Sequence, residues 1–167
     1  MQSVWLLLVA AVAVTGPLVL NGSFAPGVGE CKTPWKDCGS TGLKINNVIV
    51  QDCCSSPCKV KLGSDTKFSF TFTPNQDYTY LNQSVCGELA TACIKFPNET
   101  FGYMCHCPGC TLEPPCPFKA NRMENVTVEV PLSASFPKDL EVFAQWRITD
   151  PDNKRVGCFE VPVETVD

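Results

Sequence analysis

Histidine is almost absent from this sequence, since His106 is the only one among 167 residues. A hydrolytic triad needs a histidine as its base, and His106 lies in a cysteine-rich loop that suits this role poorly. The Gly-x-Ser-x-Gly motif of the α/β-hydrolases is also missing. The carboxylates of Asp150 and Asp152 fall in an expected turn, where acids are usually solvated. We therefore expect a protein that is not an enzyme.

The sequence also lacks a stripe of basic residues. Its 13 lysines and arginines are interspersed with 17 acids, for a net charge of -4. Proteins that bind nucleic acids usually cluster positive charge along the phosphate backbone. We therefore expect no nucleic-acid partner.

Long apolar runs are confined to the first residues. The run from Val4 to about Val14 is interrupted at Thr15, Gly16 and Pro17, short of the roughly 20 residues that span a bilayer. It has the shape of a secretory signal peptide. We expect residues 1–29 to comprise this signal and a short N-terminal segment, with the cleavage site left open. Residues 30–167 then form one domain.

Helical periodicity is absent after residue 29, and period-two alternation replaces it. Phe68, Phe70 and Phe72 alternate with polar residues, as in a strand with one buried face. Further strands are expected at 43–50, near 60–62 and at 85–96, 126–132, 140–148 and 159–163. A single open sheet could not bury so many apolar faces. The pattern predicts an all-β, disulfide-rich, immunoglobulin-like β-sandwich of two antiparallel sheets.

Twelve cysteines and several glycosylation sequons indicate a secretory route. Asparagines in Asn-x-Ser/Thr sequons occur at Asn82, Asn98 and Asn125. An oxidising compartment converts thiols to disulfides. The segment Cys105–Cys110, with sequence CHCPGC, could in principle be a metal site, a redox pair or part of a disulfide framework. The compartment favours disulfides, so we expect neither a metal site nor a cofactor.

An ordered set of motifs resembles the ML lipid-recognition domain family, and most of all its Niemann-Pick type C2 subgroup. The motifs are DCGS at 37–40, CCSSPC at 53–58, CTLEPPCP at 110–117, W-x-I-x-D at 146–150 and CFEVPV at 158–163. The resemblance extends from Asp37 to about Val163. It implies the disulfides Cys38–Cys158, Cys53–Cys58 and Cys110–Cys116.

Six further cysteines depart from the family pattern, namely Cys31, Cys54, Cys86, Cys93, Cys105 and Cys107. They allow 15 pairings. Cys86–Cys93 is not expected if both residues lie on one strand, because they would then be about 23 Å apart. If Cys110 pairs with Cys116, a redox pair Cys107–Cys110 is also excluded. Such a pair would need a helix start to lower the thiol pKa, and the prolines that follow would break a helix.

The resemblance implies an apolar pocket between the sheets for a sterol or another lipid. Family contact positions correspond to Phe96, Leu132 and Phe136. Phe136 and Phe159 replace a tyrosine and a tryptophan of the subgroup, so a polar group is missing at the entrance. Alternation also directs other candidates inward, namely Val50, Val60, Phe70, Trp146, Phe159 and Val161.

The implied function is that of a secreted or lysosomal carrier that holds a cholesterol-like sterol and transfers it between membranes. Expected partners are the lipid, membranes and a membrane sterol transporter, with the protein itself a monomer. The family also offers an alternative, extracellular lipid recognition in immune sensing or in the carriage of chemical signals.

Overall fold

The computed structural model describes residues 32–89, 92–95 and 102–167, and this part of the chain contains ten strands and no helix. None of it, accordingly, forms a helix that could cross a membrane. The expected signal segment lies outside the described residues. The strands are β1 Lys36–Asp37, β2 Leu43–Val50, β3 Cys58–Lys61, β4 Asp65–Pro74, β5 Asn82–Leu89, β6 Ala92–Lys95, β7 Cys110–Glu113, β8 Glu124–Pro131, β9 Glu141–Thr149 and β10 Arg155–Val166.

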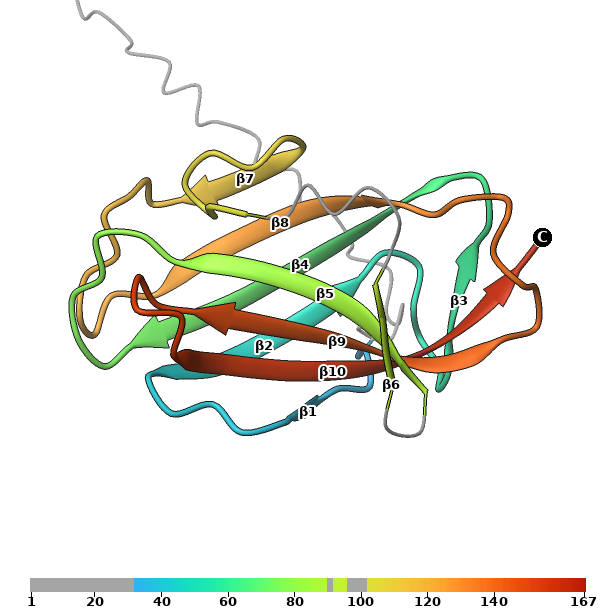
Figure 1. Ribbon diagram of the computed structural model, residues 1–167, viewed down its shortest axis with the longest axis horizontal. Helices are drawn as coiled ribbons and strands as arrows, with labels where there is room; N and C mark the ends of the chain where they lie inside the picture. Colours follow the sequence, from blue (N-terminus) through green and yellow to red (C-terminus); the bar gives the residue numbers. More distant parts are fainter. Residues whose placement is uncertain (1–31, 90–91, 96–101) are drawn as a thin grey trace, which may run out of the picture.

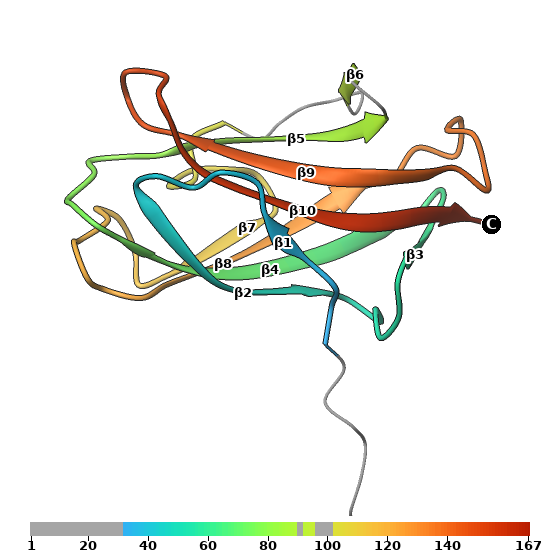
Figure 2. The same cartoon turned by 90° about the horizontal axis from the view of Figure 1, so that it is seen from below.

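Two sheets face each other across the interior, as Figures 1 and 2 show from two directions. The first has the order β1-β10-β9-β5-β6, with β3 also paired to β10. The second has the order β2-β4-β8-β7. Neighbouring strands are antiparallel except for β3 and β10, which run parallel. The predicted β-sandwich is therefore confirmed, with one parallel pair added.

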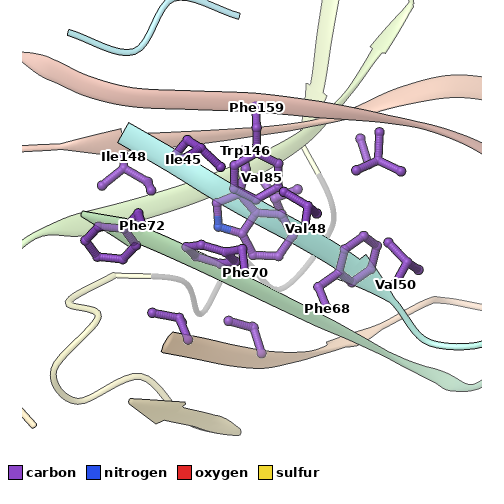
Figure 3. Close-up of a cluster of buried hydrophobic side chains, with 14 of the residues drawn as sticks. Ile45, Val48, Val50, Phe68, Phe70, Phe72, Val85, Trp146, Ile148 and Phe159 are labelled. Carbon is purple, nitrogen blue, oxygen red and sulfur yellow. The ribbon is translucent and has the colours of Figure 1, made fainter. Parts of the chain in front are cut away.

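Alternating side chains build the core as the sequence predicts. In β4, Phe68, Phe70 and Phe72 are buried, whereas Ser69 and Thr71 between them lie on the outer face and are half-buried. Figure 3 shows these rings meeting the side chains of the first sheet. The rings of Trp146 and Phe159 are stacked, with centroids 5.7 Å apart. Burial of such aromatic surface makes a large stabilising contribution to the fold.

Two expectations about the segment between residues 85 and 125 were wrong. The expected single strand 85–96 is a hairpin, in which β5 ends at Leu89 and β6 begins at Ala92. The stretch from Pro97 to Asn125 is rich in proline and cysteine and poor in alternation, which predicts a long loop, but it contains β7, which pairs with β8 over Cys110–Glu113.

For five disulfides, both cysteines lie in the described part of the chain. Cys38–Cys158 and Cys53–Cys58 are present as the resemblance implied. The other three are Cys86–Cys93, Cys105–Cys116 and Cys107–Cys110. Cys54 is also disulfide-bonded, and Cys31 lies outside the described residues. No cysteine in the described part is free.

The implied pairing of Cys110 with Cys116 is therefore wrong, because Cys105 takes Cys116 and Cys110 takes Cys107. The expectation against Cys86–Cys93 depended on both residues lying on one continuous strand. The hairpin instead brings the two Cα atoms to 5.5 Å, within the range that a disulfide requires.

Candidate functional site

An apolar cavity of about 210 Å³ lies between the sheets at one end of the sandwich. Phe68 and Val130 line it from the second sheet, and Trp146 lines it from the first. The remaining lining residues are Val60, Val85, Gly87, Ile94, Leu132, Phe136, Pro137, Leu140, Val142, Ala144, Val163 and Thr165. The other end of the interior is filled, since Phe72 packs on Phe118 with ring centroids 5.7 Å apart.

Small residues on two neighbouring strands of the first sheet leave the cavity open. Gly87 of β5 and Ala144 of β9 are register partners and both line it. Neither can reach across the space between the sheets. Further along the same strand, Trp146 fills that space and contacts Phe68 and Phe70, with ring centroids 5.3 and 5.8 Å from its own. The inner wall of the cavity thus lies where the small Ala144 is followed along β9 by the large Trp146.

The cavity offers a ligand no free polar partner among its described lining residues. Apart from Trp146 with its indole N–H, Thr165 is the only one with a polar side-chain group. Its hydroxyl donates a hydrogen bond of 2.7 Å to the carbonyl of Pro137 and accepts one of 3.0 Å from the N–H of Leu140. A polar group of a ligand inside the cavity would therefore lose its hydrogen bonds to water without replacement.

The indole N–H of Trp146 is also satisfied within the protein. It donates a 3.0 Å hydrogen bond to Oε1 of Gln83, which is 3% exposed. This bond fixes the orientation of the ring that forms the inner wall.

The cavity opens to the surface between β6 and the segment from Phe136 to Leu140. Ile94 of β6 is 45% exposed and Pro137 is also exposed, although both line the cavity. Lys138 stands beside this mouth, and its Nζ lies 3.1 Å from Oδ2 of Asp167. The hydrogen bond and the negative charge of Asp167 raise the pKa of Lys138. Charge is therefore found at the rim and apolar surface within.

The structure places the predicted lipid-contact residues in three groups. Leu132, Phe136, Val60 and Trp146 line the cavity. Four others are buried in the core but do not line the cavity, namely Val50, Phe70, Phe159 and Val161. Phe96 lies outside the described residues.

Sequence reasoning missed several residues of the mouth. Ile94, Leu140 and Val142 line the cavity but were not singled out. Leu140 and Val142 belonged to a recognised alternating run, so this signal was available. The position of Ile94 depends on the β5–β6 hairpin, which the sequence did not predict.

The glycosylation sequons differ in accessibility. Asn125 of β8 is exposed, whereas Asn82 at the start of β5 is half-buried. Asn98 lies outside the described residues. The described part contains no group of three or more histidine, cysteine or acidic side chains placed to hold a metal ion.

Comparison with solved structures supports the fold. A Niemann-Pick type C2 protein from the Japanese carpenter ant superposes with a TM-score of 0.70 at 21% identity, covering 80% of this chain and 99% of that protein. The C-terminal domain of wzt superposes with a TM-score of 0.52 at 10% identity.

Sequence comparison gives more specific relatives. NPC intracellular cholesterol transporter 2 of Bos taurus is 28% identical over 130 residues, which is 78% of this chain and 83% of the relative. The Danio rerio protein of the same name is 28% identical over 138 residues, 81% of this chain and 88% of the relative. The sequence model of the ML domain matches residues 32–165. On this match, the chain is a member of the ML domain family.

Proposed function

We propose that the protein binds a sterol-like lipid in the cavity between its sheets and transfers it reversibly between membranes. The observation that carries the proposal is an apolar cavity that opens to the surface of an otherwise filled sandwich. The names of the cholesterol-transporter relatives support a sterol as the ligand. Binding of this kind requires no catalytic group.

Desolvation supplies the driving force. Enclosing about 400 Å² of apolar ligand surface contributes on the order of 10 kcal/mol at about 25 cal/mol per Å². The loss of translational and conformational freedom on association reduces this value. The remainder is sufficient for useful affinity without a charged anchor.

The polarity of the site determines the orientation of the ligand. The hydroxyl of a sterol would find no partner inside, because the hydroxyl of Thr165 is already bonded to Pro137 and Leu140. We therefore expect the hydrocarbon tail to approach Trp146 and the hydroxyl to remain in water near Phe136 and Lys138.

The size of the cavity implies that binding enlarges it. Pockets for drug-sized ligands commonly hold about 300 Å³ or more, whereas this cavity holds about 210 Å³. The half-buried side chains of Phe136 and Leu140 at the mouth are placed to move outward as the ligand enters.

The disulfide framework and the family of the relatives support a site of action in an oxidising lumen. We place the carrier outside the cell or in the lysosome, with a membrane or a membrane sterol transporter as the transient partner and the monomer as the active form.

Titration with the fluorescent sterol dehydroergosterol tests the ligand. We expect saturable binding, and Phe136→Ala to weaken it by about tenfold, because the ring is removed from the cavity wall. Phe143→Ala is the matched control. Phe143 of β9 is 43% exposed on the outer face of the first sheet, where Nζ of Lys36 lies 5.4 Å from its ring centroid, so sterol binding should be unchanged.

Absence of saturable sterol binding, or equal binding by both variants, would contradict the proposal. A preference for an acylated glycolipid in competition would assign the cavity to lipid recognition instead. Transfer of the sterol between vesicles at acidic pH, measured by energy transfer, tests the carrier step separately.

A further inference from the structure

A buried glutamine links the disulfide Cys107–Cys110 to the cavity wall. Gln83 of β5 is 3% exposed, and its Nε2 lies 3.3 Å from Sγ of Cys107 and 3.6 Å from Sγ of Cys110. On its other side, its Oε1 accepts the indole hydrogen bond of Trp146 at 3.0 Å.

The contact with Trp146 fixes the direction of the amide. An indole N–H can only donate a hydrogen bond, so the group that faces Trp146 must be the amide oxygen. The NH₂ group of Gln83 is consequently directed at the two sulfurs. A bonded sulfur is a weak acceptor, whereas a thiolate is a charged and much stronger one. Gln83 therefore stabilises the opened disulfide more than the closed one.

Opening this bond requires little rearrangement of the chain. The two cysteines are separated by 3 positions, so the bond constrains the unfolded chain less than any longer loop would. Cys105–Cys116 encloses both residues and would still hold the loop. The N–H of Cys110 also donates a 3.2 Å hydrogen bond to the carbonyl of Cys107.

External reagents can reach the bond. Cys107 and Cys110 are both half-buried. By contrast, at least one cysteine is fully or almost fully buried in Cys38–Cys158, Cys53–Cys58 and Cys86–Cys93. Cys105–Cys116 is as accessible, but its longer loop stabilises the fold more.

We propose that Cys107–Cys110 is a thiol–disulfide exchange site that reacts with an external dithiol while the other four disulfides described at both cysteines stay oxidised. In other Cys-x-x-Cys pairs the start of a helix stabilises the thiolate. Here the amide of Gln83 has this role. The exchange is stoichiometric and reversible, and it is a property additional to lipid binding.

The exchange proceeds in two steps. A thiolate of the dithiol attacks Sγ of Cys110, the disulfide breaks, and its electron pair remains on Sγ of Cys107 next to Gln83. The second thiol of the dithiol loses its proton and attacks the sulfur of the first within the mixed disulfide, and Cys110 leaves as a thiolate. The dithiol is thereby oxidised by two electrons to its own disulfide. Cys107 and Cys110 are reduced and take up the two protons that the dithiol released.

Timed reduction of the folded protein by dithiothreitol, followed by alkylation and peptide mass analysis, tests the proposal. We expect Cys107 and Cys110 to be alkylated together and before the cysteines of Cys38–Cys158, Cys53–Cys58, Cys86–Cys93 and Cys105–Cys116. Gln83→Glu keeps an acceptor for Trp146 but replaces the donor with a carboxylate, so it should slow this first phase by about tenfold. Gln51→Glu adds the same charge at an exposed position and should leave the rate unchanged.

Earlier alkylation of any of these four pairs, or simultaneous alkylation of all five, would overturn the proposal. This order is measured on the unsubstituted protein, so the result stands even if Gln83→Glu fails to fold. The double variant Cys107→Ser/Cys110→Ser should lose the early phase, and persistence of that phase would assign it elsewhere. An unchanged rate in folded Gln83→Glu would refute the role given to Gln83.

Discussion

Asp77 joins two loops at the end of the sandwich away from the cavity. Its Oδ1 accepts a 2.9 Å hydrogen bond from the N–H of Ala120, and its Oδ2 lies 2.8 Å from Nζ of Lys119. Beside it, Tyr78 and Phe118 exchange two backbone hydrogen bonds of 3.0 Å. The hydrogen bond from Ala120 and the contact with Lys119 lower the pKa of Asp77.

This lowered pKa predicts a specific dependence of stability on pH. The contribution of Asp77 is fully present above about pH 4, the ordinary pKa of an aspartate, and is lost as pH falls through the lower pKa of the folded state. We expect Asp77→Asn to have a lower melting temperature than the unsubstituted protein by the same amount at pH 7 and pH 5. The gap should shrink at pH 3. A gap that widened on acidification would contradict this assignment.

The β5–β6 hairpin is the element that completes the mouth of the cavity. Cys93 lies next to Ile94, and its bond to Cys86 fastens β6 to β5. Ile94 thereby lines the cavity although it is 45% exposed. The disulfide at this hairpin therefore has a positioning role in addition to its effect on stability.

Removal of this bond should affect both stability and ligand binding. We expect Cys86→Ser/Cys93→Ser to lower the free energy of unfolding by about 2 to 3 kcal/mol, from the entropy of a loop of this length. Sterol affinity should also fall, because Ile94 is no longer held at the mouth. Urea denaturation and sterol titration provide the two measurements.

The control for this hairpin is Cys107→Ser/Cys110→Ser, which removes a disulfide that does not line the cavity. It should retain sterol affinity. Equal losses of affinity in the two double variants would show that the hairpin has no special role.

Strands with strict alternation of apolar and polar residues could be predicted from the sequence. The β5–β6 hairpin, which depends on a tight turn, could not. β2 has the expected bounds, and the inward residues of β4 and β9 are buried, except for the half-buried Val142. Between Leu89 and Ala92 the sequence offers no glycine, proline or asparagine to indicate a turn. The hairpin and its disulfide were missed for this reason.

The candidate site could be predicted only in part. Alternation shows which side chains point into the interior, but it does not show which of them line a cavity. Phe70 and Trp146 both point inward and both are buried, yet only Trp146 lines the cavity. The difference depends on position along the strands and on what stands opposite, which period-two patterning does not encode. The resemblance supplied Leu132 and Phe136, and both line the cavity.

Cys38–Cys158 constrains the molecule as a whole. It closes a loop with a sequence separation of 120, the longest among the disulfides defined by both partners. It joins the residue after β1 to the first half of β10, where the N–H of Cys38 also donates a 3.1 Å hydrogen bond to the carbonyl of Cys158. The first strand of the sandwich is thus fixed to the last.

Loss of this bond should cost more stability than loss of any of those other four. We expect Cys38→Ala/Cys158→Ala to lower the free energy of unfolding by about 5 kcal/mol in the chain-entropy account. Urea denaturation measures the change, with Cys107→Ser/Cys110→Ser as the short-loop reference. A smaller loss than in that reference would refute the ranking by loop length.

The interior is solid at one end and hollow at the other, and this asymmetry has a mechanical consequence. The stacked rings around Trp146, Phe159 and Phe72 act as a fixed spacer between the layers. We therefore expect thermal separation of the layers to pivot about this spacer, with its greatest amplitude at the hollow end. A guest longer than the resting hollow can enter through a small angular opening, while the contacts that keep the chain folded remain intact.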